Sequence, residues 1–205
     1  DEGEYQGTID IKSMLQYCFE EIGLETIKSK VTKSLSGLKV ACYYGCLLTR
    51  PKDVTLFDSP EYPMSMDLLM EALGAKAMEF DFKTECCGAS FSISNTDIVE
   101  SLTGKILEVA KESGAHLIVV ACPLCQSNLD MRQPDIEKHS GRKFDLPVMY
   151  FTQLMALAFG FPEKELRLPK HIVPVKAALS HIGEPVPETE KVKKSKKAVE
   201  AESEV

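Results

Sequence analysis

The sequence lacks both a long apolar run and a secretory leader. No stretch approaches the roughly 18 consecutive apolar residues of a membrane-spanning helix, and the N-terminus has neither the basic start nor the apolar segment of a signal peptide. These absences predict a soluble, cytoplasmic protein with no membrane span. Because the chain begins with Asp1 rather than Met, we expect that it was cut from a longer chain or processed.

Basic residues are also scarce relative to acidic ones. The 24 Lys and Arg residues are outnumbered by 31 Asp and Glu residues, which gives a formal net charge of -7. Nucleic-acid phosphates require a basic surface, so this balance excludes a general affinity for nucleic acid. Proteins and small molecules are the expected partners. The 205 residues, 44% of them hydrophobic, suffice for one globular domain or two small ones.

Cysteine, in contrast, is abundant. Seven cysteines are spread over more than a hundred residues. An odd number of thiols in a chain without a signal peptide favours metal or redox chemistry over disulfides.

Apolar runs alternate with amphipathic stretches through the middle of the chain. We expect strands at residues 39–44, 75–82 and 116–121, and helices at residues 64–73 and 96–113, with Gly74 and Gly114 directly after the helices. Such alternation predicts an α/β fold with a mainly parallel sheet and flanking helices.

The flanking regions are predicted to be mostly helical. The spacing of Ile11, Leu15, Cys18 and Ile22 predicts an amphipathic helix with one buried stripe, which Gly23 ends or breaks. Helices are also expected at 126–139, interrupted by a proline, and at 152–159. Beyond about residue 185 the chain has no large apolar residues other than valine, so it is expected to be disordered.

Five of the cysteines follow the ends of the three predicted strands. Cys46 follows the first strand, Cys86 and Cys87 the second, and Cys122 and Cys125 the third, in the pattern C-x39-CC-x34-C-x-x-C. Ligands of open α/β sheets bind beyond the carboxyl ends of the strands. We therefore expect these cysteines to converge on one edge of the sheet.

The C-x-x-C unit alone is compatible with a thioredoxin-like dithiol, half of a zinc site or part of an iron-sulfur site. A dithiol leaves three cysteines unexplained. A four-ligand zinc site leaves one thiol spare, and adjacent cysteines rarely suit one ion because the ring closed through their peptide is strained. Five thiolates with a vicinal pair favour a polynuclear iron-sulfur centre, with zinc as the alternative. Gly45 and Gly88 would let the backbone approach such a centre closely.

The remaining candidates each have two interpretations. Cys18 lies on an apolar helix stripe and is predicted to be a core residue. Cys42 shares a strand face with Val40 and Tyr44 and is either a core residue or an extra ligand or neighbour of the site.

Polar residues near the cysteines are similarly ambiguous. Arg50 is a candidate contact for a carboxylate or phosphate of the substrate, or forms a surface salt bridge. His171 is a candidate proton donor, or faces solvent or caps a helix. The vicinal cysteines are followed by four polar residues that either donate hydrogen bonds to sulfur or form the loop and cap the next helix: Ser90, Ser92, Ser94 and Asn95.

The segments around these cysteines resemble a known family. The stretches "ACYYGCLLTRP", "ECCGAS" and "ACPLCQSNLD" are similar to the cysteine-rich CCG domain, in particular the second such domain in the B subunit of CoB-CoM heterodisulfide reductase. The likeness runs from about Asp10 to about Leu179. It implies a connector helix region at 1–37 and a CCG iron-sulfur domain at 38–180, and the composition leaves a disordered charged tail at 181–205.

The resemblance implies a noncubane [4Fe-4S] cluster held by Cys46, Cys86, Cys87, Cys122 and Cys125. It implies a catalytic subunit that reduces a thiol disulfide, the CoB-CoM heterodisulfide of methanogenesis or an analogue. The implied partners are a ferredoxin-like iron-sulfur subunit, together with a flavin-binding subunit. Family members usually carry two CCG domains with the substrate between their clusters, so a separate N-terminal CCG half is a further expected partner.

Two other functions remain open. CCG domains also occur in lactate, glycolate, glycerol-phosphate and succinate or fumarate oxidoreductase subunits, where the centre only relays electrons. In the third interpretation the thiols hold zinc, and the helix of residues 10–31 docks an interaction partner. Metal content distinguishes the zinc protein from the two redox proteins.

Overall fold

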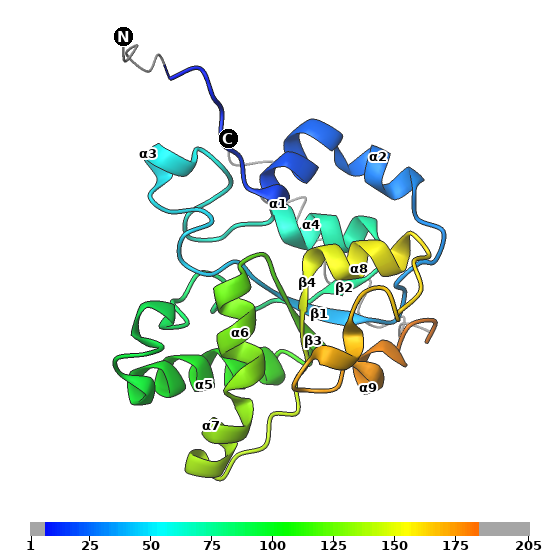
Figure 1. Ribbon diagram of the computed structural model, residues 1–205. Coiled ribbons are helices and arrows are strands. Elements are labelled where there is room, and N and C mark those ends of the chain that lie inside the picture. Colours follow the sequence, from blue (N-terminus) through cyan, green and yellow to red (C-terminus); the bar gives the residue numbers. More distant parts are fainter. Residues whose placement is uncertain (1–6, 185–205) are drawn as a thin grey trace, which may run out of the picture.

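Four parallel strands form the centre of the computed structural model, which describes residues 7–184 (Figure 1). Their order across the sheet is β2 (Lys76–Ala77), β1 (Lys39–Tyr43), β3 (Leu117–Val120) and β4 (Val148–Tyr150). β1 pairs with both β2 and β3, and β4 closes the far edge beside β3. The predicted α/β class with a parallel sheet is therefore confirmed.

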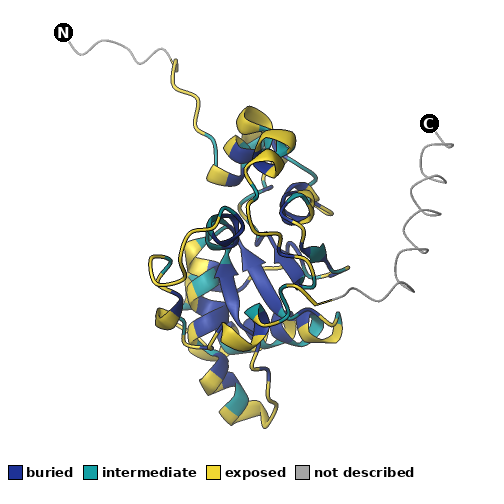
Figure 2. Ribbon diagram, turned by 90° about the vertical axis from the view of Figure 1, so that its right-hand side faces the viewer, coloured by how far each residue is buried: buried dark blue, intermediate teal, exposed yellow. Residues whose placement is uncertain are grey.

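Both faces of the sheet are covered, because alternate residues of β1 enter two separate hydrophobic clusters. Val40, Cys42 and Tyr44 point into one cluster, and Ala41 and Tyr43 point into the other. The strands are consequently buried between layers of helices (Figure 2). Such burial explains why β1 after Lys39 and all of β3 are apolar rather than alternating with polar residues.

The helices divide between these two faces. The Cys42 face packs against α1 (Met14–Tyr17), the π-helix η1 (Cys18–Ile22), α2 (Leu24–Ser29), α4 (Ser65–Ala72), α8 (Phe151–Ala158) and α9 (Lys176–Leu179). The Tyr43 face packs against α5 (Thr96–Glu112), α6 (Pro123–Met131) and α7 (Gln133–Ser140). Short helices α3 (Lys52–Thr55), η2 (Ala89–Phe91) and η3 (Leu168–Lys170) lie in the connections.

The N-terminal helix differs from the prediction. Leu15 and Cys18 are buried as expected, but Ile11 is 89% exposed and Ile22 is also exposed. The helix begins only at Met14, since the Ser13 side chain accepts a hydrogen bond from the backbone N–H of Gln16 and caps it. Ile11 therefore lies outside the helix. Gly23, with φ of 79°, separates η1 from α2, which is the predicted break.

The second strand is much shorter than the predicted 75–82. After the Met78 N–H donates to Val40 O, the chain leaves the sheet edge and buries Phe80 on the Tyr43 face. It returns at Lys83, whose carbonyl oxygen accepts from Tyr44 N (2.8 Å) and Gly45 N (3.1 Å). This return brings the segment before Cys86 against the end of β1.

Two further differences concern the C-terminal half. α6 starts at Pro123 with Cys122 as its N-cap, so Cys125 lies within the first turn of the helix rather than before it. Pro134 sits in the first turn of α7, where its missing N–H breaks no helical bond. The strand β4 at 148–150 is not among the predicted elements.

No helix in the described range 7–184 is long and apolar enough to cross a membrane.

Candidate functional site

Five cysteines gather beyond the carboxyl ends of the strands. Cys46 lies three residues after β1, the vicinal pair lies in the connection from β2 to α5, and the last two begin α6 directly after β3. Cys87 Sγ is 3.6 Å from Cys125 Sγ. Hydrogen bonding also links the Cys46 thiol with Cys86 and the Cys122 thiol with Cys125. All five are free thiols.

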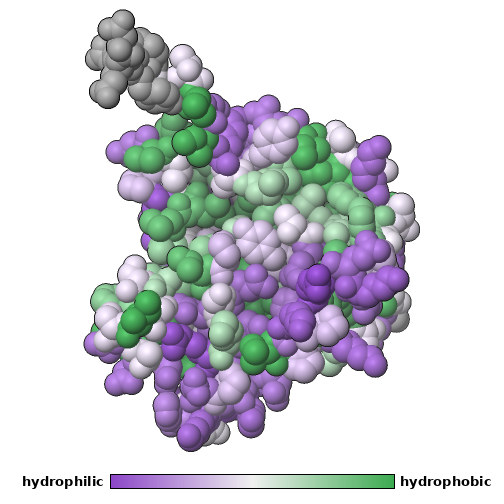
Figure 3. Space-filling model, in the orientation of Figure 1, coloured by the Kyte–Doolittle hydropathy of each residue, from purple (hydrophilic) through white to green (hydrophobic). Residues whose placement is uncertain are grey.

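The five thiols differ in their access to solvent. Cys87 and Cys125 are buried, Cys46 and Cys122 are intermediate, and Cys86 is exposed. One side of the cluster is therefore open. Large apolar side chains are exposed beside each cysteine segment, namely Leu47 (77%), Ile93 (100%) and Leu124 (62%). Figure 3 shows apolar side chains gathered across the middle of the face that it presents.

Two of the thiols are unusually acidic. Hydrogen bonding from Cys125, together with backbone N–H groups at the start of α6, lowers the pKa of Cys122 to about 5. Hydrogen bonding from Cys125 and from Asn128 lowers the pKa of Cys87 to about 6. The pKa of Cys125 is raised, because hydrogen bonding with Cys122 and with Cys87, together with burial, favours its protonated form. Hydrogen bonding at this site thus favours the thiolate form of Cys87 and of Cys122, and thiolates are the form that binds soft metals.

Gly45 provides the space that Cys125 occupies. Its φ is 72°, and a Cβ at this position would lie 2.9 Å from Cys125 Sγ. The backbone at Gly45 therefore lies close to one of the candidate ligand sulfurs. At Gly88, also in the left-handed region, a Cβ would instead lie 3.2 Å from the Cα of Val99 in α5. The absent side chain of Gly88 lets the vicinal cysteines pack against that helix.

The backbone of the vicinal cysteines is held by side chains from three elements. Thr103 Oγ1 of α5 and Asn128 Nδ2 of α6 both donate to Cys87 O, at 3.2 and 3.3 Å. Tyr43 OH, at the end of β1, donates to Glu85 O at 2.6 Å. These bonds fix the loop between the sheet and both helices.

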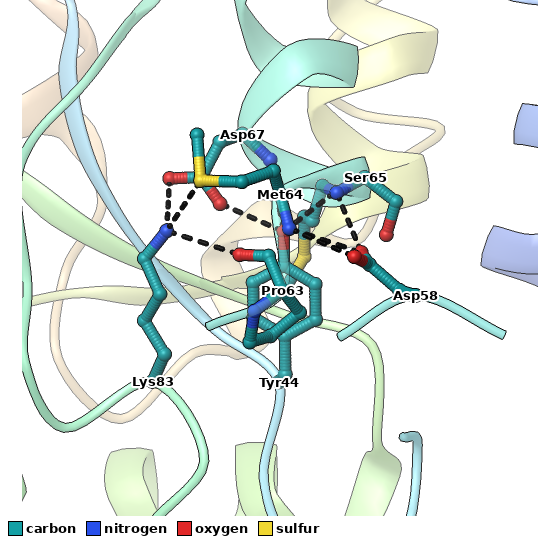
Figure 4. A network of polar contacts seen from close by, with 8 residues as sticks. Tyr44, Asp58, Pro63, Met64, Ser65, Asp67 and Lys83 are labelled. Atoms are coloured by element: carbon teal, nitrogen blue, oxygen red, sulfur yellow. Dashed lines mark hydrogen bonds and ion pairs between the residues drawn. The ribbon is translucent and has the colours of Figure 1, made fainter. Parts of the chain in front are cut away.

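A buried polar network connects the segments before Cys46 and Cys86 (Figure 4). Lys83 Nζ lies 2.7 Å from Asp67 Oδ1 in α4, and Tyr44 OH donates to Asp67 Oδ2 at 2.7 Å. Lys83 Nζ also donates to Pro63 O at 3.2 Å. Together with the backbone bond from Tyr44 to Lys83, the network forms a closed ring of contacts that sets the spacing of the two cysteine segments. Sequence reasoning missed Lys83 and Asp67, because a lone lysine and a helical aspartate normally face water.

Arg50 makes a further connection between the same segments. Its NH2 group donates to Thr84 Oγ1 at 2.8 Å, and its Nε donates to Pro60 O at 2.9 Å. Arg50 also lies 3.4 Å from the exposed carboxylate of Glu61, and its side chain remains 36% exposed. The predicted surface salt bridge exists, but the contact with buried Thr84 ties Arg50 to the site.

The structure places Cys42 apart from the buried thiols and His171 on a neighbouring pocket. Cys42 is fully buried in the cluster on the opposite sheet face from Cys87 and Cys125. His171 Nε2 lies 3.1 Å from Gln153 Nε2, and its buried Nδ1 has no hydrogen-bond partner within the described part of the chain. His171 lines a pocket of about 400 Å³ with Gln126, which follows Cys125 in α6.

The polar residues after the vicinal pair support the loop. Ser92 Oγ donates to Asn128 Oδ1 at 3.1 Å rather than to a sulfur. Asn95 is the N-cap residue of α5, although its side chain makes no capping hydrogen bond. Asn128 itself was not predicted. It lies three residues after Cys125, one helical turn along, and only the position of α6 reveals its contact with Cys87.

The sulfurs form one pair, Cys46 with Cys86, and one set of three, in which Cys125 contacts both Cys87 and Cys122. Over residues 7–184 no set of three or more His, Cys, Asp or Glu side chains has the geometry to hold a metal ion. The donors that converge here are thiols only. An all-thiol donor set suits zinc or iron-sulfur groups and not hard cations such as Mg²⁺ or Ca²⁺.

Comparison with known proteins identifies relatives of this chain. The family model described as CCG, cysteine-rich domain, matches residues 40–130. The membrane anchor subunit of 8-methylmenaquinol:fumarate reductase from Wolinella succinogenes is 38% identical over 169 residues, which are 82% of this chain and 59% of that protein. The B subunit of the ferredoxin/F(420)H(2)-dependent CoB-CoM heterodisulfide reductase from Methanosarcina acetivorans is 34% identical, over 83% of this chain and 57% of that protein.

A third relative has similar coverage. The B subunit of the ferredoxin:CoB-CoM heterodisulfide reductase from Methanosarcina mazei is 35% identical, over 83% of this chain and 57% of that protein. The chain thus spans somewhat more than half the length of these curated relatives. A crystal structure of a hypothetical protein from Helicobacter pylori matches with a TM-score of 0.55 and 13% identity, over 74% of this chain and 28% of that chain. This structural match supports the fold alone.

Proposed function

We propose that this chain, which carries a cysteine-rich domain of the CCG family in residues 40–130, is an iron-sulfur redox subunit of an oxidoreductase complex. The observation that carries the proposal is the convergence of five free thiols, with Cys87 and Cys125 sulfurs 3.6 Å apart. Two relatives named as heterodisulfide reductase B subunits support the same class. We place the domain at residues 38–180, after a connector region at 1–37; the expected tail at 181–205 lies mostly outside the described residues.

The proposed cofactor is a noncubane [4Fe-4S] cluster held by Cys46, Cys86, Cys87, Cys122 and Cys125. When bound, such a group supplies one-electron chemistry at iron coordinated by thiolate and sulfide. Five sulfurs in two sets, supplied by three chain segments, fit a group of several iron atoms better than a single zinc ion, which takes four ligands around one point. The acidic thiols of Cys87 and Cys122 give up their protons readily for this purpose.

The proposed reaction is reduction of a thiol disulfide, in which two electrons and two protons convert the S–S bond into two thiols. Exposed Cys86 would hold the cluster on the side open to solvent, and buried Cys87 and Cys125 would hold it on the side of the core. Arg50, with its partly exposed guanidinium, is the proposed contact for an anionic group of the substrate. His171 is the proposed proton donor, on the pocket that it shares with Gln126.

The proposed partners follow from the same function. Electrons would reach this chain from a ferredoxin-like iron-sulfur subunit, together with a flavin-binding subunit, and a separate N-terminal CCG half would complete the substrate site. We propose a cytoplasmic complex of this kind.

A second candidate function is electron relay in a fumarate reductase complex. The relative from Wolinella succinogenes, named as part of such an enzyme, favours it at 38% identity. In that case the cluster would supply electron transfer and would bind no disulfide. Attachment of the complex to a membrane would not depend on a spanning helix in residues 7–184.

Metal analysis tests the shared part of both proposals. The full chain, purified without oxygen, should contain about four irons with matching sulfide and give a paramagnetic resonance signal on redox poising. Zinc as the sole metal would contradict both redox functions and favour the interaction subunit. To separate the redox functions, the complex is purified with its natural partners and assayed with CoB-CoM heterodisulfide and with fumarate.

A further inference from the structure

Asn128 contacts both the backbone and the sulfur of Cys87. It is 5% exposed, and its Nδ2 lies 3.3 Å from Cys87 O and 3.6 Å from Cys87 Sγ. The longer distance is compatible with a hydrogen bond, because sulfur is a larger acceptor than oxygen. Among the described side chains near Cys87, Asn128 thus supplies an amide N–H to a thiol of the proposed site.

The orientation of this amide is fixed by its other end. Asn128 Oδ1 accepts hydrogen bonds from Arg132 Nε at 3.3 Å and from Ser92 Oγ at 3.1 Å. Arg132 has no acceptor atom, so the group facing it must be the amide oxygen. Arg132 is held in turn by its bond to Ser92 O at 2.8 Å. The N–H₂ end of Asn128 therefore has to point toward Cys87.

We propose that Asn128 is a positioning residue that raises the reduction potential of the cluster through its Nδ2–H···Sγ hydrogen bond to Cys87. The inference rests on the proposed iron-sulfur function. A hydrogen bond to a coordinating thiolate stabilises the reduced state, which carries one more negative charge. Arg132 and Ser92 make the effect specific, because they prevent the amide from turning its oxygen toward the sulfur.

Substitutions of Asn128 distinguish the effect of its hydrogen-bond donor from the effect of its side-chain shape. In Asn128→Asp, one carboxylate oxygen still accepts from Arg132 and Ser92, while the other replaces the donor that faces Cys87. In Asn128→Ser, the amide N–H donor is removed and no charge is added. Asn95→Asp is the matched control: it makes the same chemical change at the other asparagine of the chain, whose side chain caps no helix bond.

The measurement is a redox titration of the purified, iron-loaded full chain, followed by paramagnetic resonance, with iron content determined for each variant. For Asn128→Asp we expect an equilibrium constant for reduction lowered about tenfold, which corresponds to about 59 mV for a one-electron couple. Asn128→Ser should change it in the same direction by less, and Asn95→Asp should leave it at the wild-type value.

The possible outcomes are distinct. Iron-loaded variants of Asn128 that titrate like wild type, or like Asn95→Asp, overturn the inference. If Asn128→Asp folds but loads no iron, the neutral Asn128→Ser variant decides the question. Folded variants that both fail to load iron, beside a normally loaded Asn95→Asp, support the role of Asn128 in positioning Cys87. A wild-type chain that binds no iron contradicts the proposed function itself, independently of Asn128.

Discussion

Lys83 and Asp67 form an ion pair that is almost completely removed from water. Lys83 Nζ lies 2.7 Å from Asp67 Oδ1, and their side chains are 2% and 4% exposed. Burial raises the pKa of Asp67, and the Lys83 charge opposes this shift. Moving two charges out of water is costly, and the cost is recovered only when each charge keeps its partners. Tyr44 OH and Pro63 O supply the remaining ones.

Replacement of Lys83 by Met should therefore be strongly destabilising. It leaves the Asp67 carboxylate buried without its counter-charge, at an expected cost of about 3–5 kcal/mol in the free energy of unfolding. Urea denaturation of the full chain measures this cost. The control is Lys143→Met, which breaks the 2.7 Å ion pair of a 75% exposed lysine with Glu137 and should cost about 0–1 kcal/mol. Equal stabilities of the two variants would contradict the structural role of Lys83.

The sheet is better predicted from the sequence than the surroundings of the cysteines are. The strand at 117–120 and the helix at 96–112 can be identified because their apolar patterns are clear and Gly114 lies between them. β4 is missed because its three residues run directly into α8 without a turn residue. The burial of Lys83 and the contact of Asn128 with Cys87 depend on segments far apart in the chain, and local patterns do not report such contacts.

Gly45→Ala should lower the iron content of the purified chain more than a glycine-to-alanine substitution elsewhere. The new Cβ would lie 2.9 Å from Cys125 Sγ, so Cys125 must move away from Cys87. Gly141→Ala is the control, because Gly141 has a similar φ of 68° and no atom within 4 Å of the added Cβ. Both variants carry the backbone cost of about 1–2 kcal/mol for a left-handed residue, and only Gly45→Ala should lose iron. Equal iron contents would show that the thiols tolerate displacement of Cys125.

Serine substitutions should distinguish ligands from core cysteines. Cys87→Ser is expected to lose most of the iron while the sheet remains folded, as checked by circular dichroism. Cys42→Ser should keep the iron, because Cys42 lies on the opposite face of the sheet, but should lower stability by about 1–3 kcal/mol through its buried hydroxyl. Loss of iron in Cys42→Ser would support Cys42 as an extra ligand. An unchanged iron content in Cys87→Ser would contradict the five-ligand assignment.

Stability should fall below neutral pH in part because of His116. Its ring stacks on His181 with centroids 3.7 Å apart, and its Nδ1 accepts a hydrogen bond from Lys39 N at 3.2 Å. Burial lowers its pKa, with smaller contributions from the charges of His181 and Lys39, while Glu184 acts in the opposite direction.

The sign of the pH effect follows from this lowered pKa. The unfolded chain, with an ordinary histidine pKa of about 6.5, takes up a proton before the folded chain does. The contribution of neutral His116 is therefore complete above pH of about 6.5 and is lost as the pH falls through the folded pKa. His116→Gln, whose side-chain oxygen can still accept from Lys39 N, should flatten the dependence of the unfolding free energy on pH below about 6.5. The comparison is urea denaturation of both proteins across this range, and parallel curves would exclude His116 as the group responsible.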